Sequence, residues 1–192
     1  MSEGARAPLW PWLHEPLQAA LQQLSGHHAV LLHGPQGVGQ FEFALALARS
    51  WLCEAQPVGS AFHVACGQCP SCRLIEAGSH PDLQVILPEA LQASLGWVSS
   101  GSDEGSDKAS EKAEGKSKKL SQEIKVEAIR QVVTFSQSTV SRGRAKVVVI
   151  HPAERMNMVS SNTLLKTLEE PPGQVRFVLS AGSLEDVLPT VR

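Results

Sequence analysis

The stretch Ala29-Val-Leu-Leu-His-Gly-Pro-Gln-Gly-Val-Gly-Gln-Phe41 decides the fold class of this chain. Residues 29–33 are a short apolar run, which is typical of a buried strand in a parallel sheet. A tight loop over 34–39 follows, and residues 41–52 then show the Ala- and Leu-rich periodicity of a helix. Because a phosphate-binding loop requires a strand before it and a helix after it, this order predicts an α/β domain of the phosphate-loop type.

The glycines of this loop are spaced for phosphate binding, but the charged and hydroxyl side chains of a working site are missing. A working loop places Lys and then Ser or Thr after its last glycine, for the phosphates and for Mg²⁺. Gln40 and Phe41 stand at these two positions. A charged hydrogen bond contributes about 1.5–3 kcal/mol. We therefore expect a degenerate nucleotide loop made by Gly34, Gly37, Gly39, Gln40 and Phe41, and regard an unrelated glycine turn and a working ATPase as weaker alternatives.

The second half of an ATPase site should follow a later buried strand, where an Asp holds Mg²⁺ and a Glu polarises water. Val147–Ile150 is the clearest buried strand of the chain, and His151 and Pro152 come directly after it. Glu154 is three residues further on than His151. We therefore expect a degenerate second ATPase motif at His151 and Pro152. A plain loop histidine is the simpler interpretation of His151, and a ligand for another group is the alternative.

The rest of the chain alternates helices with strands. We predict helices over 14–24, 124–136 and 159–169, and strands over 83–87, 147–150 and 175–179. The last helix must end before Pro171, because the residue preceding a proline avoids helical geometry. This alternation indicates a layered α/β domain with a mostly parallel sheet flanked by helices.

Three cysteines lie within seven residues, at positions 66, 69 and 72, and a fourth lies 13 residues upstream of Cys66. The two-residue gaps let the thiols point to a common centre, and a reducing compartment disfavours disulfides. Four thiolates suit tetrahedral Zn²⁺ with no open position. The spacing therefore predicts a structural zinc module over 53–72 with Cys53, Cys66, Cys69 and Cys72 as ligands. An iron–sulfur cluster and free thiols are the alternatives.

Composition excludes several other classes of protein. The 192 residues include 17 basic and 19 acidic side chains and have a net charge of −2, which argues against a dedicated nucleic-acid binder. Only the basic run Arg142–Lys146 favours that alternative, and we interpret it as a solvated lead-in to a strand. Residues 99–119 contain six Ser, five Lys and five acidic residues, which predicts a disordered insertion within the domain. No apolar run approaches the roughly 20 residues that cross a bilayer, and no signal pattern begins the chain, so we expect a soluble cytoplasmic protein.

The predicted last helix has a distinctive sequence, Asn162-Thr-Leu-Leu-Lys-Thr-Leu-Glu-Glu-Pro-Pro172. It resembles the signature helix of the bacterial clamp-loader AAA+ subunits of DNA polymerase III. A four-cysteine module after the phosphate-loop helix is also characteristic of that family, and Ile124–Arg130 is similar to the helix before its second conserved strand. The resemblance runs from about Leu13 to Arg192, and it implies an AAA+ core over residues 1–192.

The resemblance also implies a function. Clamp-loader subunits form a five-membered, ATP-driven ring that opens the sliding clamp and loads it on primed DNA. The altered residues of both ATPase motifs are those of a non-hydrolysing stator member, with no catalytic residues, whose partners are the gamma/tau ATPase and delta subunits. A gamma/tau-like motor ATPase is the alternative. The family's lid and collar domains have no counterpart in these 192 residues, so we expect the N-terminal part of such a subunit.

Overall fold

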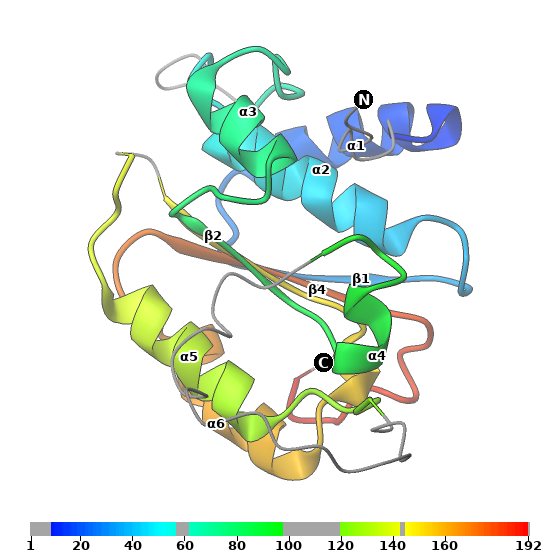
Figure 1. Ribbon diagram of the computed structural model, residues 1–192. Coiled ribbons are helices and arrows are strands. Elements are labelled where there is room, and N and C mark those ends of the chain that lie inside the picture. The colour runs from blue at the N-terminus through cyan, green and yellow to red at the C-terminus, as the bar shows by residue number, and fades with distance from the viewer. Residues whose placement is uncertain (1–8, 57–61, 98–119, 143–144, 192) are drawn as a thin grey trace, which may run out of the picture.

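The computed structural model describes residues 9–56, 62–97, 120–142 and 145–191 (Figure 1). Within these ranges, four strands form one sheet in the order β1-β4-β3-β2, and every neighbouring pair is parallel. The strands are β1 (Ala29–His33), β2 (Leu83–Ile86), β3 (Lys146–Ile150) and β4 (Val175–Ala181). The predicted parallel α/β architecture is confirmed.

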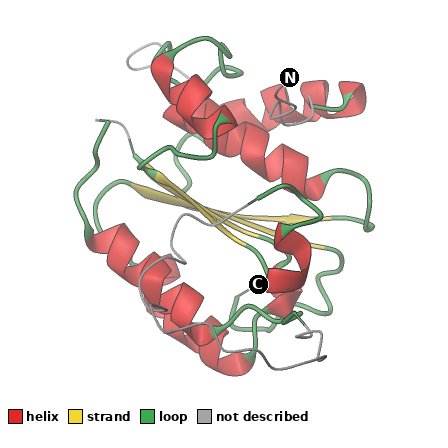
Figure 2. Cartoon of the chain, viewed as in Figure 1, coloured by secondary structure: helices red, strands yellow, loops and turns green. Residues whose placement is uncertain are grey.

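Helices cover both faces of this sheet, which makes a three-layer arrangement (Figure 2). On one face lie the 3₁₀ turn η1 (Pro11–Leu13), α1 (His14–Gln23), α2 (Gln40–Leu52) and α3 (Pro70–Glu76). On the other face lie α5 (Val126–Gln137) and α6 (Met158–Glu169). The short helix α4 (Glu89–Gln92) follows β2, and the 3₁₀ turn η2 (Ala153–Arg155) follows β3.

The core consists of two apolar layers, one on each side of the sheet. Val147 and Val149 pack with α1 and α2, whereas Val148 and Ile150 pack with α5 and α6. None of these four side chains is exposed to solvent. A strand that is buried on both faces has apolar residues at every position, which explains why this run was so clear in the sequence.

The helix predicted to begin at Ile124 begins at Val126 instead. Ile124 makes a parallel bridge with Met156, and its N–H group donates to the carbonyl oxygen of Arg155 at 2.9 Å. Its backbone is therefore paired with the segment after β3 and is not available to start a helix. The side chain is buried all the same, with 1% of its surface exposed.

The interpretation of the basic run as a solvated lead-in is wrong for Lys146. This residue opens β3, which lies between β2 and β4, so neighbouring strands cover it. Its ammonium group lies 3.7 Å from the carboxylate of Asp82 and 4.0 Å from the centre of the Phe135 ring. A buried cation needs such partners, because burying an unpaired charge away from water costs on the order of several kcal/mol.

The predicted insertion and the predicted zinc module differ in how much of each the structure describes. The insertion predicted over 99–119 lies outside the described residues. The predicted zinc module over 53–72 is described except for residues 57–61, and it ends within the first turn of α3, a helix that the sequence pattern did not predict. Among the described residues, no helix is both long and apolar enough to span a membrane.

Candidate functional site

The carboxyl ends of three strands bring the two candidate ATPase motifs together. Gly34 follows β1, His151 follows β3 and Gly182 follows β4, and both β1 and β3 pair in parallel with β4. A cavity of about 520 Å³ lies there, lined by the glycine loop, by residues of the 151–155 segment and by α4. In open parallel sheets, ligands bind outside the carboxyl ends of the strands. The cavity is therefore at the expected place for a ligand site.

The glycine loop has the backbone of a phosphate loop. Gly37 and Gly39 have φ angles of +87° and +97°, a left-handed conformation that side chains disfavour. Gly39 is the N-cap of α2, so the first free N–H groups of that helix face the loop. The conformation explains why glycine stands at both positions.

Gln40 turns its side chain back onto the loop. Its amide nitrogen donates to the carbonyl oxygens of Gly34 and Pro35, at 2.5 and 2.6 Å. Gln40 is uncharged and its donors are engaged by the loop itself. It therefore offers no cation at the position where a working loop has its lysine.

Phe41 and His151 pack against each other, although they come from the two separate motifs. Their ring centres are 5.2 Å apart, and the imidazole Nδ1 lies 2.9 Å from the hydroxyl of Ser180 on β4. Burial lowers the pKa of His151 below its ordinary value of 6.5, while Glu154 and Glu42 oppose this shift. His151 is thus a packed residue with a hydrogen-bond partner, and neither ring offers the oxygen ligands that Mg²⁺ prefers.

Two carboxylates line the same cavity. Glu42 lies in the first turn of α2, where the helix dipole favours a negative charge. Glu154 accepts a hydrogen bond from the N–H group of Gly182 at 2.9 Å. Arg155 is a cationic residue of the same lining. The lining of this cavity thus holds two acidic side chains and one cationic side chain.

Two exposed tryptophans cover the outside of the glycine loop, and the sequence pattern did not indicate them. Trp10 and Trp12 stack with ring centres 5.2 Å apart, and the indole N–H of Trp12 donates to the carbonyl oxygen of Val38 at 3.4 Å. A side chain placed on Gly39 would lie 2.9 Å from Leu13 and 3.2 Å from Trp10. The segment before α1 therefore packs directly on the loop.

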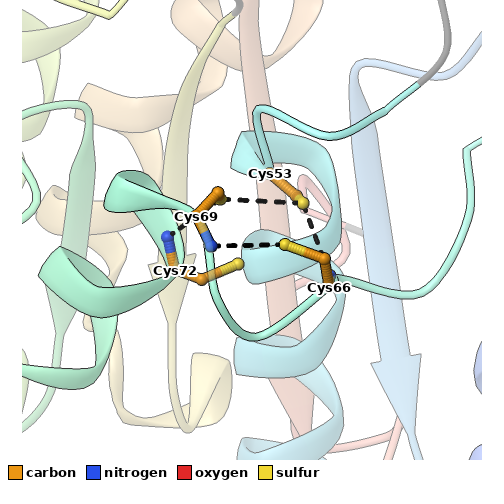
Figure 3. Close-up of side chains that lie close together, drawn as sticks. All are labelled: Cys53, Cys66, Cys69 and Cys72. Carbon is orange, nitrogen blue, oxygen red and sulfur yellow. Dashed lines mark hydrogen bonds between the residues drawn. The ribbon is translucent and has the colours of Figure 1, made fainter.

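The second candidate site is the cysteine cluster, which lies between the end of α2 and the start of α3 (Figure 3). The sulfur atoms of Cys53, Cys66, Cys69 and Cys72 all lie within 4.8 Å of one another, and those of Cys53 and Cys69 are 3.9 Å apart. None of the four forms a disulfide. The structure thus brings together all four residues that the sequence predicts as ligands.

Backbone N–H groups surround the sulfur atoms. The Cys66 sulfur accepts from Gln68 and Cys69, and the Cys69 sulfur accepts from Cys72, each at 3.4 Å. The N–H groups of Gln68 and Cys69 lower the pKa of Cys66 to about 6. Burial raises the pKa of Cys72 to about 12. A bound cation would favour the thiolate form of both residues, since metal binding deprotonates thiols.

The geometry of the cluster fits a metal ion. Bonds of about 2.3 Å from zinc to four sulfurs place neighbouring sulfurs about 3.8 Å apart in a tetrahedron. The distance of 3.9 Å between Cys53 and Cys69 agrees with that edge. Soft thiolates select zinc or iron–sulfur clusters over magnesium and calcium. The four cysteines can therefore hold a metal, and their closed arrangement suits a structural site.

Comparisons with known proteins agree with this architecture. Residues 11–192 match the family model described as DNA polymerase III, delta subunit. The chain is 36% identical over 186 residues to DNA polymerase III subunit delta' of Yersinia pestis, and 33% identical over 190 residues to that of Pseudomonas aeruginosa. These alignments cover 95% and 97% of this chain, but 45% and 47% of the relatives. The chain thus spans less than half the length of these relatives.

Two further relatives carry the names of other subunits. DNA polymerase III subunit tau of Escherichia coli is 34% identical over 154 residues, which are 80% of this chain and 18% of that protein. A solved structure of a gamma subunit-related protein from Thermotoga maritima superposes with a TM-score of 0.54 over 91% of this chain and 42% of that one. Its sequence identity is 19%, so it supports the fold alone.

The fold and the two sites define a phosphate-loop type of α/β domain that has an inserted four-cysteine module. Within that class, the chain belongs to the family of the DNA polymerase III delta subunit. The predicted resemblance to bacterial clamp-loader subunits is confirmed, since delta' subunits are similar to this chain over nearly its whole length. The signature sequence Asn162–Pro172 lies mainly on α6, where Leu164 is fully buried against α5.

Proposed function

We propose that this chain is the AAA+ core of a non-hydrolysing, delta'-type stator subunit of the DNA polymerase III clamp loader. In this role it supports the ATP-driven loading of the sliding clamp on primed DNA, in the cytoplasm. Its partners are the gamma/tau ATPase and delta subunits of a five-membered ring. The identity of 33–36% to delta' over nearly the whole chain supports this assignment.

The observation that carries the proposal is the contact between Phe41 and His151, with ring centres 5.2 Å apart. These are the positions where a motor subunit needs a magnesium-binding hydroxyl and a magnesium-binding carboxylate. Gln40 adds a neutral side chain that binds its own loop. These contacts support a loop that keeps the backbone shape of a nucleotide site but lacks the side chains that bind the phosphates and magnesium.

A gamma/tau-like motor ATPase is the second candidate function. The 34% identity to tau of Escherichia coli over 80% of the chain favours it. The two functions differ in the chemistry of Gln40, Phe41, His151 and Pro152, since a motor needs a cation and magnesium ligands at these positions. On that chemistry we favour the stator.

Titration with a fluorescent ATP analogue and Mg²⁺ tests the proposal on the purified chain. The double variant Gln40→Lys, Phe41→Thr restores both missing groups and should gain affinity. In the matched control Gln40→Met, Phe41→Val, the new side chains resemble Lys and Thr in shape but lack the charge and the hydroxyl. This control should not gain nucleotide affinity. We expect no saturable binding to the unaltered chain. Saturable, Mg²⁺-dependent binding as tight as that of the restored variant would contradict the proposal.

We further propose that the ion held by the four cysteines is structural Zn²⁺. Elemental analysis should find about one zinc per chain and no iron. Substitution of Cys66→Ser with Cys69→Ser should remove the metal, whereas the exposed neighbour His63→Ala should retain it. Iron in place of zinc, or no metal in freshly purified protein, would contradict this assignment.

A further inference from the structure

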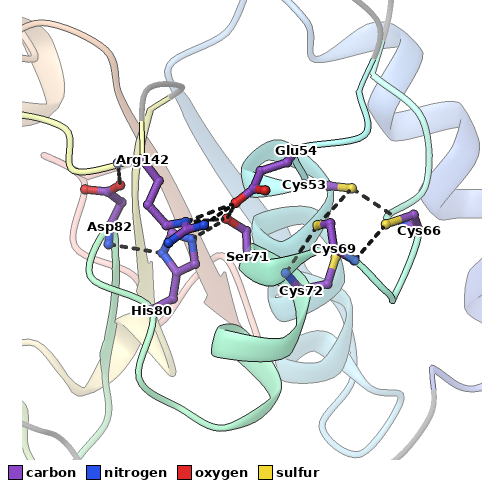
Figure 4. Close-up of polar contacts among 9 residues, drawn as sticks. All are labelled: Cys53, Glu54, Cys66, Cys69, Ser71, Cys72, His80, Asp82 and Arg142. Atoms are coloured by element: carbon purple, nitrogen blue, oxygen red, sulfur yellow. Dashed lines mark hydrogen bonds and ion pairs between the residues drawn. The ribbon is translucent and has the colours of Figure 1, made fainter.

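A polar network joins the cysteine cluster to the loop between α5 and β3 (Figure 4). Its members, which we call the Glu54 network, are Glu54, Ser71, His80, Asp82 and Arg142. Glu54 follows Cys53 in the sequence, and Ser71 lies between Cys69 and Cys72. Arg142 is 88 residues away from Glu54 in the chain. The network therefore crosses from the cysteine module to a distant part of the fold.

Glu54 is the centre of this network. One of its carboxylate oxygens accepts from Arg142 Nε at 3.0 Å and from Arg142 Nη2 at 2.8 Å. The same oxygen accepts from the hydroxyl of Ser71 at 2.6 Å. These contacts lower the pKa of Glu54, first through Ser71 and then through Arg142. The backbone N–H of Glu54 also bonds to the sulfur of Cys69.

His80 has a structural task in the network, although its contact with Ser71 looks like a base beside a nucleophile. The N–H group of Asp82 donates to His80 Nδ1 at 3.1 Å. A neutral imidazole that accepts at Nδ1 has its proton on Nε2. The Nε2–H group, 3.1 Å from the Ser71 hydroxyl, therefore donates to Ser71 and cannot remove its proton. Both side chains are also buried, with 5% and 0% of their surfaces exposed.

Asp82 holds the other end of the network. Its two carboxylate oxygens accept from the N–H groups of Ser141 and Arg142, each at 2.8 Å. The carboxylate is 1% exposed and lies 3.7 Å from the ammonium group of Lys146. The backbone of Arg142 is thus bound to Asp82, directly before β2, while its side chain is bound to the cysteine module through Glu54.

We propose that the cysteine module positions the loop at Ser141 and Arg142 through Glu54 and Ser71, so that metal occupancy of the cysteines stabilises this loop. Both residues that orient the Arg142 guanidinium are sequence neighbours of candidate ligands. A metal that fixes Cys53, Cys69 and Cys72 fixes Glu54 and Ser71 with them. The inference rests on the proposed metal centre. Glu54 is a positioning residue in it, not a ligand.

Coupling of this kind is reciprocal: if the metal stabilises the loop, contact with the loop strengthens metal binding by the same factor. The Glu54–Arg142 pair is about one-third exposed on both sides, so its contribution is modest. Loss of the pair should therefore change each equilibrium by about two- to fivefold. Both effects are measurable on the purified chain.

Amide hydrogen exchange at Ser141 and Arg142 is the direct readout, because their N–H groups bind Asp82. We expect chelation of the metal to raise exchange at these two amides by about two- to fivefold, and Glu54→Gln to do the same in zinc-saturated protein. A zinc titration against a competing chelator should show Glu54→Gln weakened by a similar factor. The control is Glu15→Gln, an exposed residue in the first turn of α1. It should leave the exchange unchanged.

The outcomes separate this inference from the proposed metal centre. Unchanged exchange at Ser141 and Arg142 after chelation, in protein that elemental analysis shows to have lost its zinc, overturns the coupling while the metal centre stands. Unchanged exchange in zinc-loaded Glu54→Gln overturns the role of Glu54. A chain that never binds zinc, by elemental analysis, overturns both the metal centre and the coupling.

Discussion

Phe41 and His151 come from the two separate candidate motifs and pack against each other, with ring centres 5.2 Å apart. Neither side chain is a magnesium ligand of the kind that an ATPase needs at these positions. Restoring one position alone would leave the other ring in place beside a new polar group. The reversal experiment changes Gln40 and Phe41 and leaves His151 in place, so we expect it to raise nucleotide affinity without restoring full activity.

Gly39 provides a prediction at the scale of one residue. Its φ of +97° disfavours any side chain, and Leu13 lies 2.9 Å from the place of a new Cβ atom. We expect Gly39→Ala to lower the free energy of unfolding by about 1–2 kcal/mol in urea denaturation. The control is Gly26→Ala, where no atom lies within 4 Å of the new Cβ, and it should stay within about 0.5 kcal/mol of the parent. Equal stability of the two variants would contradict the packing of Leu13 on the loop.

His151 provides a second prediction at the scale of one residue, because burial lowers its pKa below 6.5 in the folded chain. As the pH falls, His151 takes up its proton at a higher pH in the unfolded chain than in the folded chain. The stabilisation by the buried neutral imidazole is therefore complete above about pH 6.5 and is lost below it. We expect His151→Gln to reduce the fall in the free energy of unfolding between about pH 7.5 and 5.5. Exposed His14→Gln is the control. A parallel pH dependence of parent and His151→Gln would contradict the burial of a neutral imidazole.

At the scale of elements, the Asn157 cap fixes the start of α6. Its side-chain oxygen accepts from the N–H group of Ser160 at 2.9 Å. We expect Asn157→Ala to cost about 0.5–2 kcal/mol of stability, measured by chemical denaturation. Asn162, exposed on the same helix, is the control, and Asn162→Ala should change stability by less than about 0.5 kcal/mol. If both substitutions cost the same, the cap does not determine the helix start.

The order and type of the main elements could be predicted from the sequence, because strong periodicity and glycine or proline boundaries mark them. β3 is an example, since a short apolar run rich in β-branched residues is typical of a strand that is buried on both faces. α3 was missed, since its seven residues are too few to show an apolar period and include Pro70, Ser71 and Cys72. The start of α5 was misplaced because Ile124 pairs with a residue that is 32 positions away, and periodicity does not register such contacts.

The candidate sites could be predicted only in part, because some of their features depend on contacts between segments that are distant in the sequence. Residue types revealed the missing lysine and the four cysteines, since both depend on local spacing. The burial of Lys146, the cover of Trp10 and Trp12 and the Glu54 network all depend on contacts between distant segments. No pattern in one sequence reports such contacts, and only the assembled fold does.

At the scale of the whole molecule, the two sites lie at different parts of one sheet. The glycine loop is at the carboxyl ends of the strands, whereas the Glu54 network binds Asp82, just before the start of β2. α2 connects them, because Gly39 caps its first turn and Cys53 its last. The cysteine module therefore extends from the same helix that an ATPase would use to bind a phosphate.

The most direct test of the account is the steady-state release of phosphate from Mg²⁺–ATP by the purified chain. The account predicts a rate that equals the rate of an identically purified Gln40→Met, Phe41→Val variant, since neither protein can hold magnesium under the γ-phosphate. Phosphate release that increases with the concentration of the unaltered chain, requires Mg²⁺ and is absent from the variant would contradict the account.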